Sequence, residues 1–460
     1  MSNLTFASLA LPTAIVENLT GLGYTEMTPI QAASLPKVLQ GLDIIGQGKT
    51  GSGKTAAFGL GILAKLAVKK FRVQSLVLCP TRELADQVAG EIRKLGRSIH
   101  NIKVLTLCGG VPFGPQLGSL DHGAHIIVGT PGRVEEHLAK GSLKLDDLTT
   151  LVLDEADRML EMGFQPALDA IMAYAPTDRQ TLLFSATYPK QIAEMAARLM
   201  KNPELIKVET SHSSVTISQH FYQIGSNSER LQAVQLLLKA HQPVSSVVFC
   251  NTRKETQEVA DALADAGFSV LALHGDLEQR DRDQTLVRFA SKTVSVLVAT
   301  DVAARGLDID ALDAVINYQL AHDVDTHTHR IGRTGRAGSS GIACSLFSPQ
   351  DGYKMGLLED LLNTSLEGEA LPALSVLEKA PARPPMTSLW IDAGKRQKLR
   401  AGDVLGALTA DQQLNRDHIG KISLFDDWAY VAVRSDIVNI ALNMFRQGIK
   451  GRNIRVKVVS

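Results

Sequence analysis

The segment 48–55 reads Gly48-Lys49-Thr50-Gly51-Ser52-Gly53-Lys54-Thr55, a complete G-x-x-x-x-G-K-T pattern. In this pattern, glycines let backbone N–H groups close around phosphate oxygens, and the N-terminus of the following helix, predicted at 56–69, adds its dipole. We predict that the Lys54 ammonium reaches the outer phosphates of a nucleoside triphosphate and that the Thr55 hydroxyl ligates Mg²⁺. The alternative is a glycine-rich turn that binds nothing, and the strand and helix predicted on either side argue against it.

Short apolar runs alternate with amphipathic stretches on both sides of this loop, a rhythm typical of a parallel sheet buried by helices on both faces. The first series of predicted strands comprises 42–45, 75–79, 104–107, 126–128, 151–153 and 181–184. A second series follows the polar stretch 209–218 and comprises 247–250, 270–273, 294–299 and 314–317. The sequence therefore predicts two α/β domains in tandem.

Most runs of the first series end in a polar or glycine-rich signature. Besides the phosphate loop, these are Pro80-Thr81-Arg82-Glu83, Thr130-Pro131-Gly132-Arg133, Asp154-Glu155-Ala156-Asp157 and Ser185-Ala186-Thr187. Ligands of open α/β sheets bind outside the carboxyl ends of the strands. We therefore expect all of these signatures to face one site.

Two of the signatures have a chemical role only in the context of the phosphate loop. Asp154 follows a strand and can hold Mg²⁺, which leaves Glu155 to orient or deprotonate the attacking water. Taken alone, such an acidic string is more often the solvated start of a helix. Ser185-Ala186-Thr187 could similarly be helix-capping hydroxyls, or could link the hydrolysis site to a neighbouring surface.

The second domain contributes His329-Arg330-Ile331-Gly332-Arg333-Thr334-Gly335-Arg336. The guanidinium groups of Arg333 and Arg336 could stabilise charge on a transferring phosphoryl group, as arginine fingers do. Solvated charge or binding of RNA phosphates is an equally open reading of this basic loop. We disfavour a metal site at His327 and His329 because no third ligand stands at a suitable spacing.

In this order and spacing, the motifs resemble those of the DEAD-box RNA helicases, from Phe6 to Gly338. The segments that carry the resemblance are Thr-Gly-Ser-Gly-Lys-Thr, Pro-Thr-Arg-Glu-Leu, Thr-Pro-Gly-Arg, Asp-Glu-Ala-Asp, Ser-Ala-Thr, Ala-Arg-Gly-Leu-Asp and His-Arg-Ile-Gly-Arg-Thr-Gly-Arg. The sequence departs from the family's usual pattern at Met27, Gly48 and Thr328. These departures remove none of the chemical groups assigned above and bear most on adenine selectivity.

The resemblance implies an RNA-dependent ATPase that uses ATP and Mg²⁺ to separate or remodel short RNA duplexes. It implies that Gln31 reads the adenine edge, that the Phe6 ring stacks nearby and that Asp308 completes the ATP site from the second domain. It further implies a set of RNA contacts that are mostly to backbone and phosphate, and hence little sequence preference in the core. These contacts are Pro80, Arg82, Gly110, Thr130 and Arg133 in the first domain, and Arg253, Gly275, Gln279, Arg282, Thr300 and Asp301 in the second.

The last 75 or so residues read as strand, helix, strand, strand, helix, strand, the order of an RRM-like fold. Between Met386 and Ser460 there are 12 Lys and Arg against 7 Asp and Glu, although the whole chain is balanced at 48 each. Trp390, Trp428 and Tyr430 could stack on bases, or could be ordinary core or surface aromatics. A basic loop could instead grip phosphates without stacking, through Lys395, Arg396, Lys398 and Arg400.

The fold class expected from pattern and resemblance is α/β, with two RecA-like parallel-sheet domains in tandem plus a C-terminal α+β RRM-like domain. The expected boundaries are 1–208, 218–365 and 386–460, and the prolines of 365–385 mark a linker that cannot hold a helix. This architecture resembles a bacterial subgroup whose tail directs the helicase to a hairpin of 23S ribosomal RNA. We therefore expect 23S rRNA and large-subunit precursor particles as partners.

Composition narrows the setting of the protein. Four scattered cysteines without a C-x-x-C pair argue against a zinc site or a disulfide framework, and each is expected to be a small core residue. Residues 1–11 lack a basic stretch followed by an apolar run, and the chain has no long uncharged apolar segment. We expect a soluble, cytoplasmic monomer. A DNA helicase and an ATP-gated RNA clamp that unwinds little are the competing functions.

Overall fold

The computed structural model describes residues 5–48, 51–208, 217–304, 312–335, 341–411 and 413–459. The chain forms two compact units, Met1–Ser213 and Ser214–Ser460. Lys49, Thr50, Asp308 and Arg336, four of the predicted site residues, lie outside the described residues.

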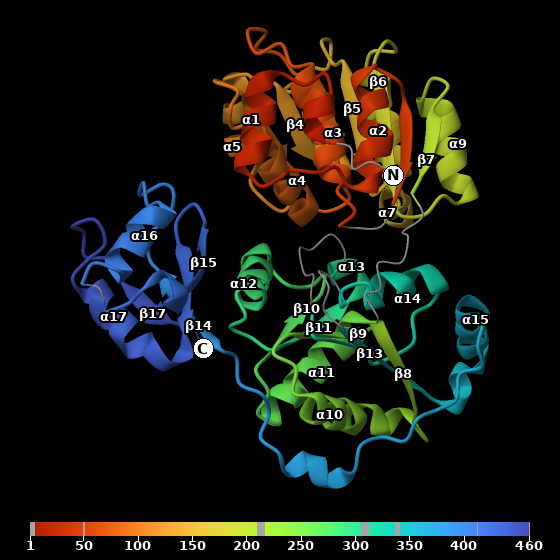
Figure 1. The fold of residues 1–460 in the computed structure, drawn as a ribbon, viewed down its shortest axis with the longest axis vertical. Helices are drawn as coiled ribbons and strands as arrows, with labels where there is room; N and C mark the ends of the chain where they lie inside the picture. The colour runs from red at the N-terminus through yellow and green to blue at the C-terminus, as the bar shows by residue number, and fades with distance from the viewer. Residues whose placement is uncertain are drawn as a thin grey trace. The chain divides into compact units, whose positions relative to one another are not determined.

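The first unit contains a seven-stranded parallel sheet with the strand order β3-β4-β2-β5-β6-β1-β7 (Figure 1). Its strands are β1 Ile44–Gln47, β2 Ser75–Leu78, β3 Val104–Leu107, β4 Ile126–Gly129, β5 Thr150–Asp154, β6 Gln180–Ser185 and β7 Glu204–Lys207. Its helices are η1 Phe6–Ser8, α1 Thr13–Gly21, α2 Pro29–Leu39, α3 Lys54–Ala64, α4 Arg82–Leu95, α5 Phe113–Asp121, α6 Pro131–Ala139, α7 Ala156–Glu161, α8 Gln165–Tyr174 and α9 Lys190–Leu199.

Alternating side chains of these strands build two separate cores, one on each face of the sheet. Val77 and Val152 pack in a cluster with side chains of α1 to α4. Their neighbours Leu76, Leu78 and Leu151 pack in a second cluster with side chains of α6 to α9. Strands buried on both faces need the continuous apolar runs seen in the sequence, so the predicted helix-covered parallel sheet is confirmed.

The second unit begins with another parallel sheet, of six strands in the order β10-β11-β9-β12-β13-β8. The strands are β8 Ile217–Gln223, β9 Ser246–Cys250, β10 Val270–Leu273, β11 Val296–Thr300, β12 Ala314–Asn317 and β13 Gly341–Phe347. The helices are η2 Asn227–Glu229, α10 Arg230–His241, α11 Arg253–Asp265, α12 Gln279–Ala290, α13 Asp301–Ala304, α14 Val324–Ile331, η3 Pro349–Asp351 and α15 Gly352–Leu362. Helices α10 and α11 cover one face of this sheet, and α12 and α13 cover the other.

The tail forms a four-stranded antiparallel sheet in the order β15-β16-β14-β17, with two helices on one face. Its elements are β14 Met386–Ile391, α16 Ala401–Leu408, η5 Arg416–His418, β15 Ile419–Leu424, β16 Ala429–Arg434, η6 Ser435–Ile437, α17 Val438–Arg446 and β17 Val456–Val458. Leu389, Val431 and Val433 point to the helices and form the core. The predicted RRM-like element order is confirmed.

The segment 365–385 is more ordered than a free linker. It contains a short 3₁₀ helix, η4 Leu374–Glu378, so the prediction that this stretch cannot hold a helix is wrong. Prolines exclude an α-helix but permit 3₁₀ and extended backbone, which side chains elsewhere then hold. Glu369 N–H donates to the Phe221 carbonyl at 2.7 Å, and the Lys239 ammonium donates to the Leu377 carbonyl at 2.6 Å. The segment therefore lies as a strap along the second unit.

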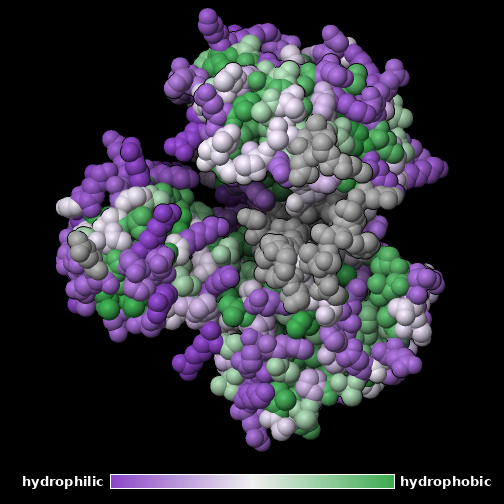
Figure 2. All heavy atoms as spheres, viewed as in Figure 1, coloured by the Kyte–Doolittle hydropathy of each residue, from purple (hydrophilic) through white to green (hydrophobic). Residues whose placement is uncertain are grey.

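Polar side chains cover much of the face drawn in Figure 2, interrupted by small apolar patches. All four cysteines are buried, as predicted, and burial raises the pKa of Cys108, Cys250 and Cys344 to about 12. Among the described residues, no helix has the length and apolar character needed to cross a membrane.

Candidate functional site

The phosphate loop leads directly from β1 into α3. Gly53 stands at the N-cap of α3 with φ +94°, a left-handed backbone that favours glycine, and a Cβ there would displace the Gln31 side chain. Lys54 is the first residue of α3 and is 7% exposed, and its ammonium donates to the Gly48 carbonyl at 2.7 Å. The lysine is thus held inward over the loop, as phosphate binding requires.

Gln31, the predicted adenine reader, is tied to the same loop. Its side-chain carbonyl accepts from the Thr28 N–H at 2.9 Å, and its amide nitrogen donates to the Gly53 carbonyl at 3.1 Å. Phe6, which the resemblance places near the adenine, is 2% exposed and packs edge-on against Tyr24 with a ring distance of 6.2 Å. The Gln31 amide therefore links the start of α2 to the phosphate loop, and the adenine contacts stay a prediction.

Asp154 and Glu155 lie where β5 ends. The Asp154 side chain is 3% exposed. Burial raises the pKa of its carboxyl, while the nearby Lys54 ammonium and the Glu155 backbone N–H act to lower it. Glu155 adopts a left-handed backbone with φ 52° and ψ 53° at the N-cap of α7, a conformation that costs a non-glycine residue about 1–3 kcal/mol. Strained backbone of this kind commonly occurs at functional sites. Here the left-handed conformation of Glu155 makes the chain turn sharply after the buried Asp154 carboxylate.

Asp157 joins this acidic motif to Ser185-Ala186-Thr187, a role that the sequence did not assign to it. Its Oδ2 atom accepts from the Ala186 N–H at 3.1 Å, the Thr187 N–H at 3.0 Å and the Thr187 hydroxyl at 3.0 Å. Thr187 therefore does not cap α9, whose N-cap is Pro189. Of the two readings left open for this signature, these contacts favour a link between the end of β6 and the hydrolysis site.

The strand order separates two groups of predicted residues along the carboxyl edge of the first sheet. The nucleotide residues follow β5, β6 and β1, which are neighbours, and the predicted RNA contacts follow β3, β4 and β2, which are also neighbours. The RNA group is held together by hydrogen bonds between loops. Gly109 N–H donates to the Thr130 hydroxyl at 3.4 Å, and the Arg133 guanidinium donates to the Val111 carbonyl at 3.0 Å.

The other predicted RNA residues of the first unit lie in the same region. Arg82 begins α4 just after β2 and pairs with Asp86 at 3.6 Å. Gly110 has φ +73°, which allows the chain to turn after β3. One edge of the sheet thus holds Arg82, Gly110, Thr130 and Arg133, and the fifth predicted contact, Pro80, follows β2 at the same edge.

The second sheet shows the same separation. The predicted RNA contacts follow the neighbouring strands β10, β11 and β9. Arg253 begins α11 and pairs with Asp276 at 2.6 Å, while the Arg282 guanidinium on α12 donates to the Ala303 carbonyl at 3.1 Å. Gln279 donates to Asp283 at 2.8 Å within α12, and Thr300 is the last residue of β11. Asp301 differs because its carboxylate pairs with the buried Arg330 side chain, and its predicted RNA contact stays a prediction.

Arg333, the described member of the predicted finger pair, follows α14 and is 6% exposed. It lines a small hollow together with Phe249, Asp301, Ala304, His329 and Arg330. The described residues contain no group of three or more His, Cys, Asp or Glu side chains placed to hold a metal ion. His327 is instead a buried structural residue, 1% exposed, whose Nε2 lies 3.1 Å from the Gln219 side-chain carbonyl.

His327 is expected to destabilise the fold in acid. Burial, followed by the nearby Arg330 charge, lowers the pKa of His327 from 6.5 to about 4. Below pH 6.5 His327 takes up a proton in the unfolded chain but stays neutral in the folded chain. The free energy of unfolding therefore falls as the pH drops toward 4. Between pH 6.5 and 5 the loss is about 2 kcal/mol. Urea unfolding across this range should show a shallower acid slope for His327→Gln than for wild type and for the exposed control His100→Gln. Equal slopes in all three proteins would contradict this assignment.

Two aromatic residues of the tail, Tyr430 and Trp428, contact helix α12 of the same unit. Trp390 and Tyr430 are cross-strand partners on the sheet face opposite the helices. Tyr430 is 3% exposed and its hydroxyl donates to Gln284 of α12 at 3.2 Å, while the Trp428 ring lies 5.0 Å from the Arg280 guanidinium. Ser388 on the same face lies 2.9 Å from the Thr293 hydroxyl. Protein already covers Tyr430, which argues against its predicted role in base stacking.

The basic loop of the tail is exposed throughout. Lys395, Arg396, Lys398 and Arg400 all lie on the surface between β14 and α16. Arg396 pairs with Asp427 at 2.9 Å and Asp426 at 3.8 Å, and the Arg400 backbone N–H donates to Asp403 at 2.9 Å. Arg452, which the sequence did not single out, donates to the Gln397 carbonyl of this loop at 3.0 Å. This adds a fifth cation beside the loop.

Family models match three consecutive parts of the chain. Residues 28–195 match the DEAD/DEAH box helicase family, and residues 229–338 match the helicase conserved C-terminal domain. Residues 388–458 match the DbpA RNA binding domain.

Similar proteins cover nearly the whole chain. The ATP-dependent RNA helicase DbpA of Escherichia coli (strain K12) is 53% identical over 98% of both chains. The DEAD-box ATP-dependent RNA helicase CshA of Geobacillus kaustophilus is 41% identical over 80% of this chain and 79% of that protein. Among solved structures, S. cerevisiae Dbp5 bound to RNA and ADP BeF3 has a TM-score of 0.71, with 27% identity over 80% of this chain and 95% of that one.

Proposed function

The chain belongs to the DEAD-box ATP-dependent RNA helicases of the DbpA type, and from this premise we propose that it remodels short duplexes of 23S ribosomal RNA in precursors of the large ribosomal subunit. The single observation that carries the proposal is the tail, which matches the DbpA RNA binding domain over residues 388–458. The helicase core supplies contacts to backbone and phosphate, which carry no sequence information. Selection of one RNA therefore falls to the tail. A cytoplasmic location and a monomeric state are parts of the same proposal.

The donor set beside the phosphate loop fits Mg²⁺. Mg²⁺ prefers oxygen ligands and is commonly held by one or two carboxylates together with substrate phosphates, not by an all-protein cage. The Asp154 carboxylate is buried, and Lys54 is close enough to act on its pKa. We assign Asp154 and Thr55 as the protein ligands. When bound, the ion would neutralise the charge that develops on the phosphate oxygens.

The roles of the protein groups in ATP hydrolysis follow from their placement. Lys54 leaves the Gly48 carbonyl to bind the outer phosphates, and the glycines at 48, 51 and 53 let the loop close around them. Glu155, at the turn after the buried Asp154, takes the proton of the attacking water. Arg333 and Arg336 stabilise the transferring phosphoryl group. Asp157 relays the state of this site to the backbone at Ala186 and Thr187.

For the tail, the structure favours phosphate binding through the basic loop over base stacking. Tyr430 is covered through its contact with α12, and Trp428 lies between the Phe425 ring at 5.6 Å and the Arg280 guanidinium at 5.0 Å. The four cations of the loop are exposed, and among the described residues only Arg396 forms a side-chain ion pair with an acidic residue. Because the strap, held to the second unit by Lys239, tethers the tail to this unit, RNA bound by the tail is kept at a raised local concentration.

Charge reversal in the basic loop is expected to remove the preference for 23S rRNA. Replacing Lys395, Arg396, Lys398 and Arg400 with Glu should bring ATPase stimulation by 23S rRNA fragments down to that by poly-A. It should also lower the salt slope of binding by about 0.7–0.9 per lost phosphate contact. Tyr430→Ala should lower the free energy of unfolding and should largely keep the preference for 23S rRNA fragments over poly-A.

The measurement is ATPase rate against RNA concentration at several salt concentrations. A matched control is the pair Lys190→Glu and Arg198→Glu, exposed cations of α9 in the first unit. If the loop variant still ranks the RNAs as wild type does, while Tyr430→Ala loses the ranking, the stacking mode holds instead. If wild type itself does not prefer 23S rRNA fragments over poly-A, the proposed substrate is wrong.

A further inference from the structure

Arg330 is the largest fully buried side chain among the residues that the structure describes, with 1% of it exposed. It lies on α14, one helical turn before Arg333, and its guanidinium is 5.2 Å from the Phe249 ring. Burial of a charged group is costly unless every hydrogen bond is made. A charge placed so deeply, beside the proposed finger, therefore calls for a specific role.

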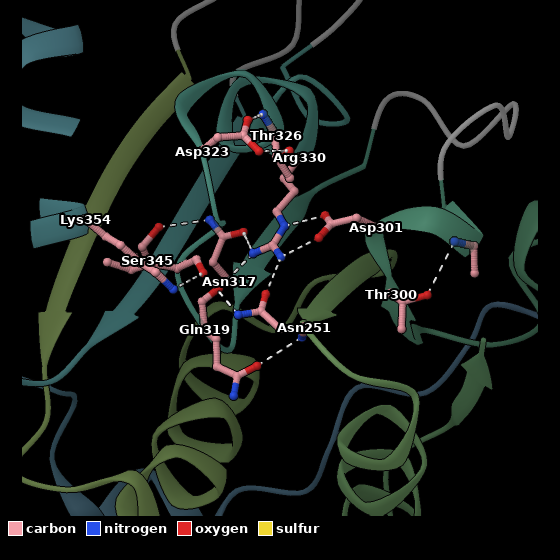
Figure 3. Close-up of polar contacts among 12 residues, drawn as sticks. Asn251, Thr300, Asp301, Asn317, Gln319, Asp323, Thr326, Arg330, Ser345 and Lys354 are labelled. Atoms are coloured by element: carbon pink, nitrogen blue, oxygen red, sulfur yellow. Dashed lines mark hydrogen bonds and ion pairs between the residues drawn. The ribbon is translucent and has the colours of Figure 1, made fainter. Parts of the chain in front are cut away.

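The surroundings of Arg330 use its complete hydrogen-bonding capacity (Figure 3). Nε and Nη2 donate to the two carboxylate oxygens of Asp301 at 2.6 and 2.7 Å and so form a bidentate ion pair. Nη2 also donates to the Asn251 side-chain carbonyl at 2.8 Å. Nη1 donates to the Gln319 backbone carbonyl at 2.7 Å and to the Asn317 side-chain carbonyl at 3.3 Å. An arginine has five N–H donors, and all five are engaged.

The acceptors come from the carboxyl ends of three adjacent strands. Asn251 follows β9, Asp301 follows β11, and Asn317 ends β12. Two of these positions adjoin proposed RNA contacts, since Asn251 lies two residues before Arg253 and Asp301 directly follows Thr300. A second layer orients the acceptors. Asn317 donates to the Ser345 hydroxyl at 2.9 Å, and the Asn251 N–H donates to the Gln319 side-chain carbonyl at 2.9 Å.

We propose that Arg330 is a positioning residue that couples RNA contact at the ends of β9 and β11 to the placement of Arg333. The planar guanidinium fixes the distances between the two RNA-side loops and the helix that leads to Arg333. A shift of either loop on RNA must move this helix or break a charge-assisted bond in a buried setting. The inference rests on the proposed roles of Arg253, Thr300 and Arg333, and it adds a residue that touches neither RNA nor ATP.

Lysine cannot replace Arg330. A lysine keeps the charge but has three donors on a single atom, so it cannot grip Asp301 with two parallel bonds and also reach Asn251 and Gln319. Asn251→Ala is a milder change because it removes one of the five acceptors, on the side of β9 alone. Both variants test the same connection: Arg330→Lys disrupts several of its hydrogen bonds, and Asn251→Ala removes one.

The second unit offers a matched control in Arg230, which is 3% exposed. Its guanidinium donates to the Asn227 side chain at 2.9 Å, the Tyr318 carbonyl at 2.6 Å, the Leu346 carbonyl at 3.0 Å and Asp351 at 2.9 Å. Arg230 thus resembles Arg330 in burial and pairing, and it also reaches the end of β12. Among the described residues, no hydrogen bond joins Arg230 to the ends of β9 or β11.

The experiment compares full-length wild type with Arg330→Lys, Asn251→Ala and Arg230→Lys. For each protein, ATP turnover is measured without RNA and as a function of RNA concentration, and thermal unfolding is followed alongside. At saturating RNA, turnover of Arg330→Lys should fall at least about fivefold toward the RNA-free rate, the lower end of common coupling factors. Asn251→Ala should fall in the same direction by less. Arg230→Lys should be less stable than wild type and keep wild-type stimulation at a temperature where it is folded.

The outcomes separate the inference from its premises. If Arg230→Lys loses stimulation to the same degree as Arg330→Lys, in step with lost stability, both arginines are merely structural and the inference falls. Wild-type stimulation in Arg330→Lys and Asn251→Ala would overturn it as well. A wild-type protein whose turnover does not respond to RNA would instead remove the premise, namely the RNA-dependent activity itself.

Discussion

Lys54→Ala should abolish ATP turnover, with a loss of at least about 10³-fold. The Lys54 ammonium lies buried at the start of α3, where it combines with the helix dipole and the loop amides to hold the outer phosphates. Alanine removes the cation and keeps the helix, because alanine has the highest helix propensity. ATP affinity should fall together with turnover. Equilibrium binding of a fluorescent ATP analogue and release of phosphate, measured separately, check both parts.

Glu155→Gln separates binding from chemistry at the same site. Glutamine keeps the size of the side chain and can occupy the same left-handed position at the N-cap of α7, but it cannot accept the proton of the attacking water. ATP binding should stay near the wild-type value while turnover is lost. The variant should then remain on RNA in the presence of ATP, because release follows hydrolysis. RNA retention in a filter-binding chase measures this.

A control lysine lies at the other end of the same helix. Lys65, the C-cap of α3, donates to the Val38 carbonyl and the Gln180 side chain, both at 2.7 Å, away from the phosphate loop. Lys65→Ala should lower stability and leave turnover of the folded protein unchanged. Wild-type turnover in Glu155→Gln would remove Glu155 as the base, and unchanged ATP affinity in Lys54→Ala would remove Lys54 as the phosphate ligand.

Continuous apolar runs located most strands of the two parallel sheets, but β7, β8 and β13 were not predicted. Predicted strands 104–107, 270–273 and 314–317 coincide with β3, β10 and β12. β7 and β8 lie at sheet edges, where one side lacks a neighbour and polar residues are tolerated, so no continuous apolar run announces them. β8, for example, reads Ile-Ser-Gln-His-Phe-Tyr-Gln. Helix α3 ends at Ala64 instead of residue 69, an error at a boundary, where sequence signals are weakest.

Long-range contacts limited the prediction of the sites. The nucleotide motifs could be placed because each follows its own strand, and local sequence is enough to place a residue at a strand end. The strap along the second unit and the cover over Tyr430 depend on partners such as Lys239 and Gln284, more than a hundred residues away in sequence. The role of Arg330 was missed for the same reason. Its acceptors converge from three separate segments, which no local pattern reveals.

Arg333→Ala should lower RNA-stimulated ATP turnover by up to about 10³-fold while changing ATP affinity far less. Arginine fingers act on charge that develops in the transition state, so their loss lowers kcat and kcat/KM together and leaves ground-state binding nearly intact. Arg333 is 6% exposed and lies one turn after the anchored Arg330. Single-turnover kinetics and equilibrium ATP binding, measured with saturating RNA, distinguish the two effects.

Arg333→Lys sharpens this test because it keeps the positive charge and removes the planar fork. If the two parallel N–H groups are what stabilise the phosphoryl oxygens, lysine should recover only a minor part of the lost rate. Arg336→Ala, at the second predicted finger, should show the same pattern of lost turnover with retained affinity. A loss of ATP affinity in Arg333→Ala with unchanged turnover at saturating ATP would mean that Arg333 is a ground-state ligand. A loss confined to RNA affinity would mean that this segment is a basic loop that binds RNA phosphates and not an arginine finger.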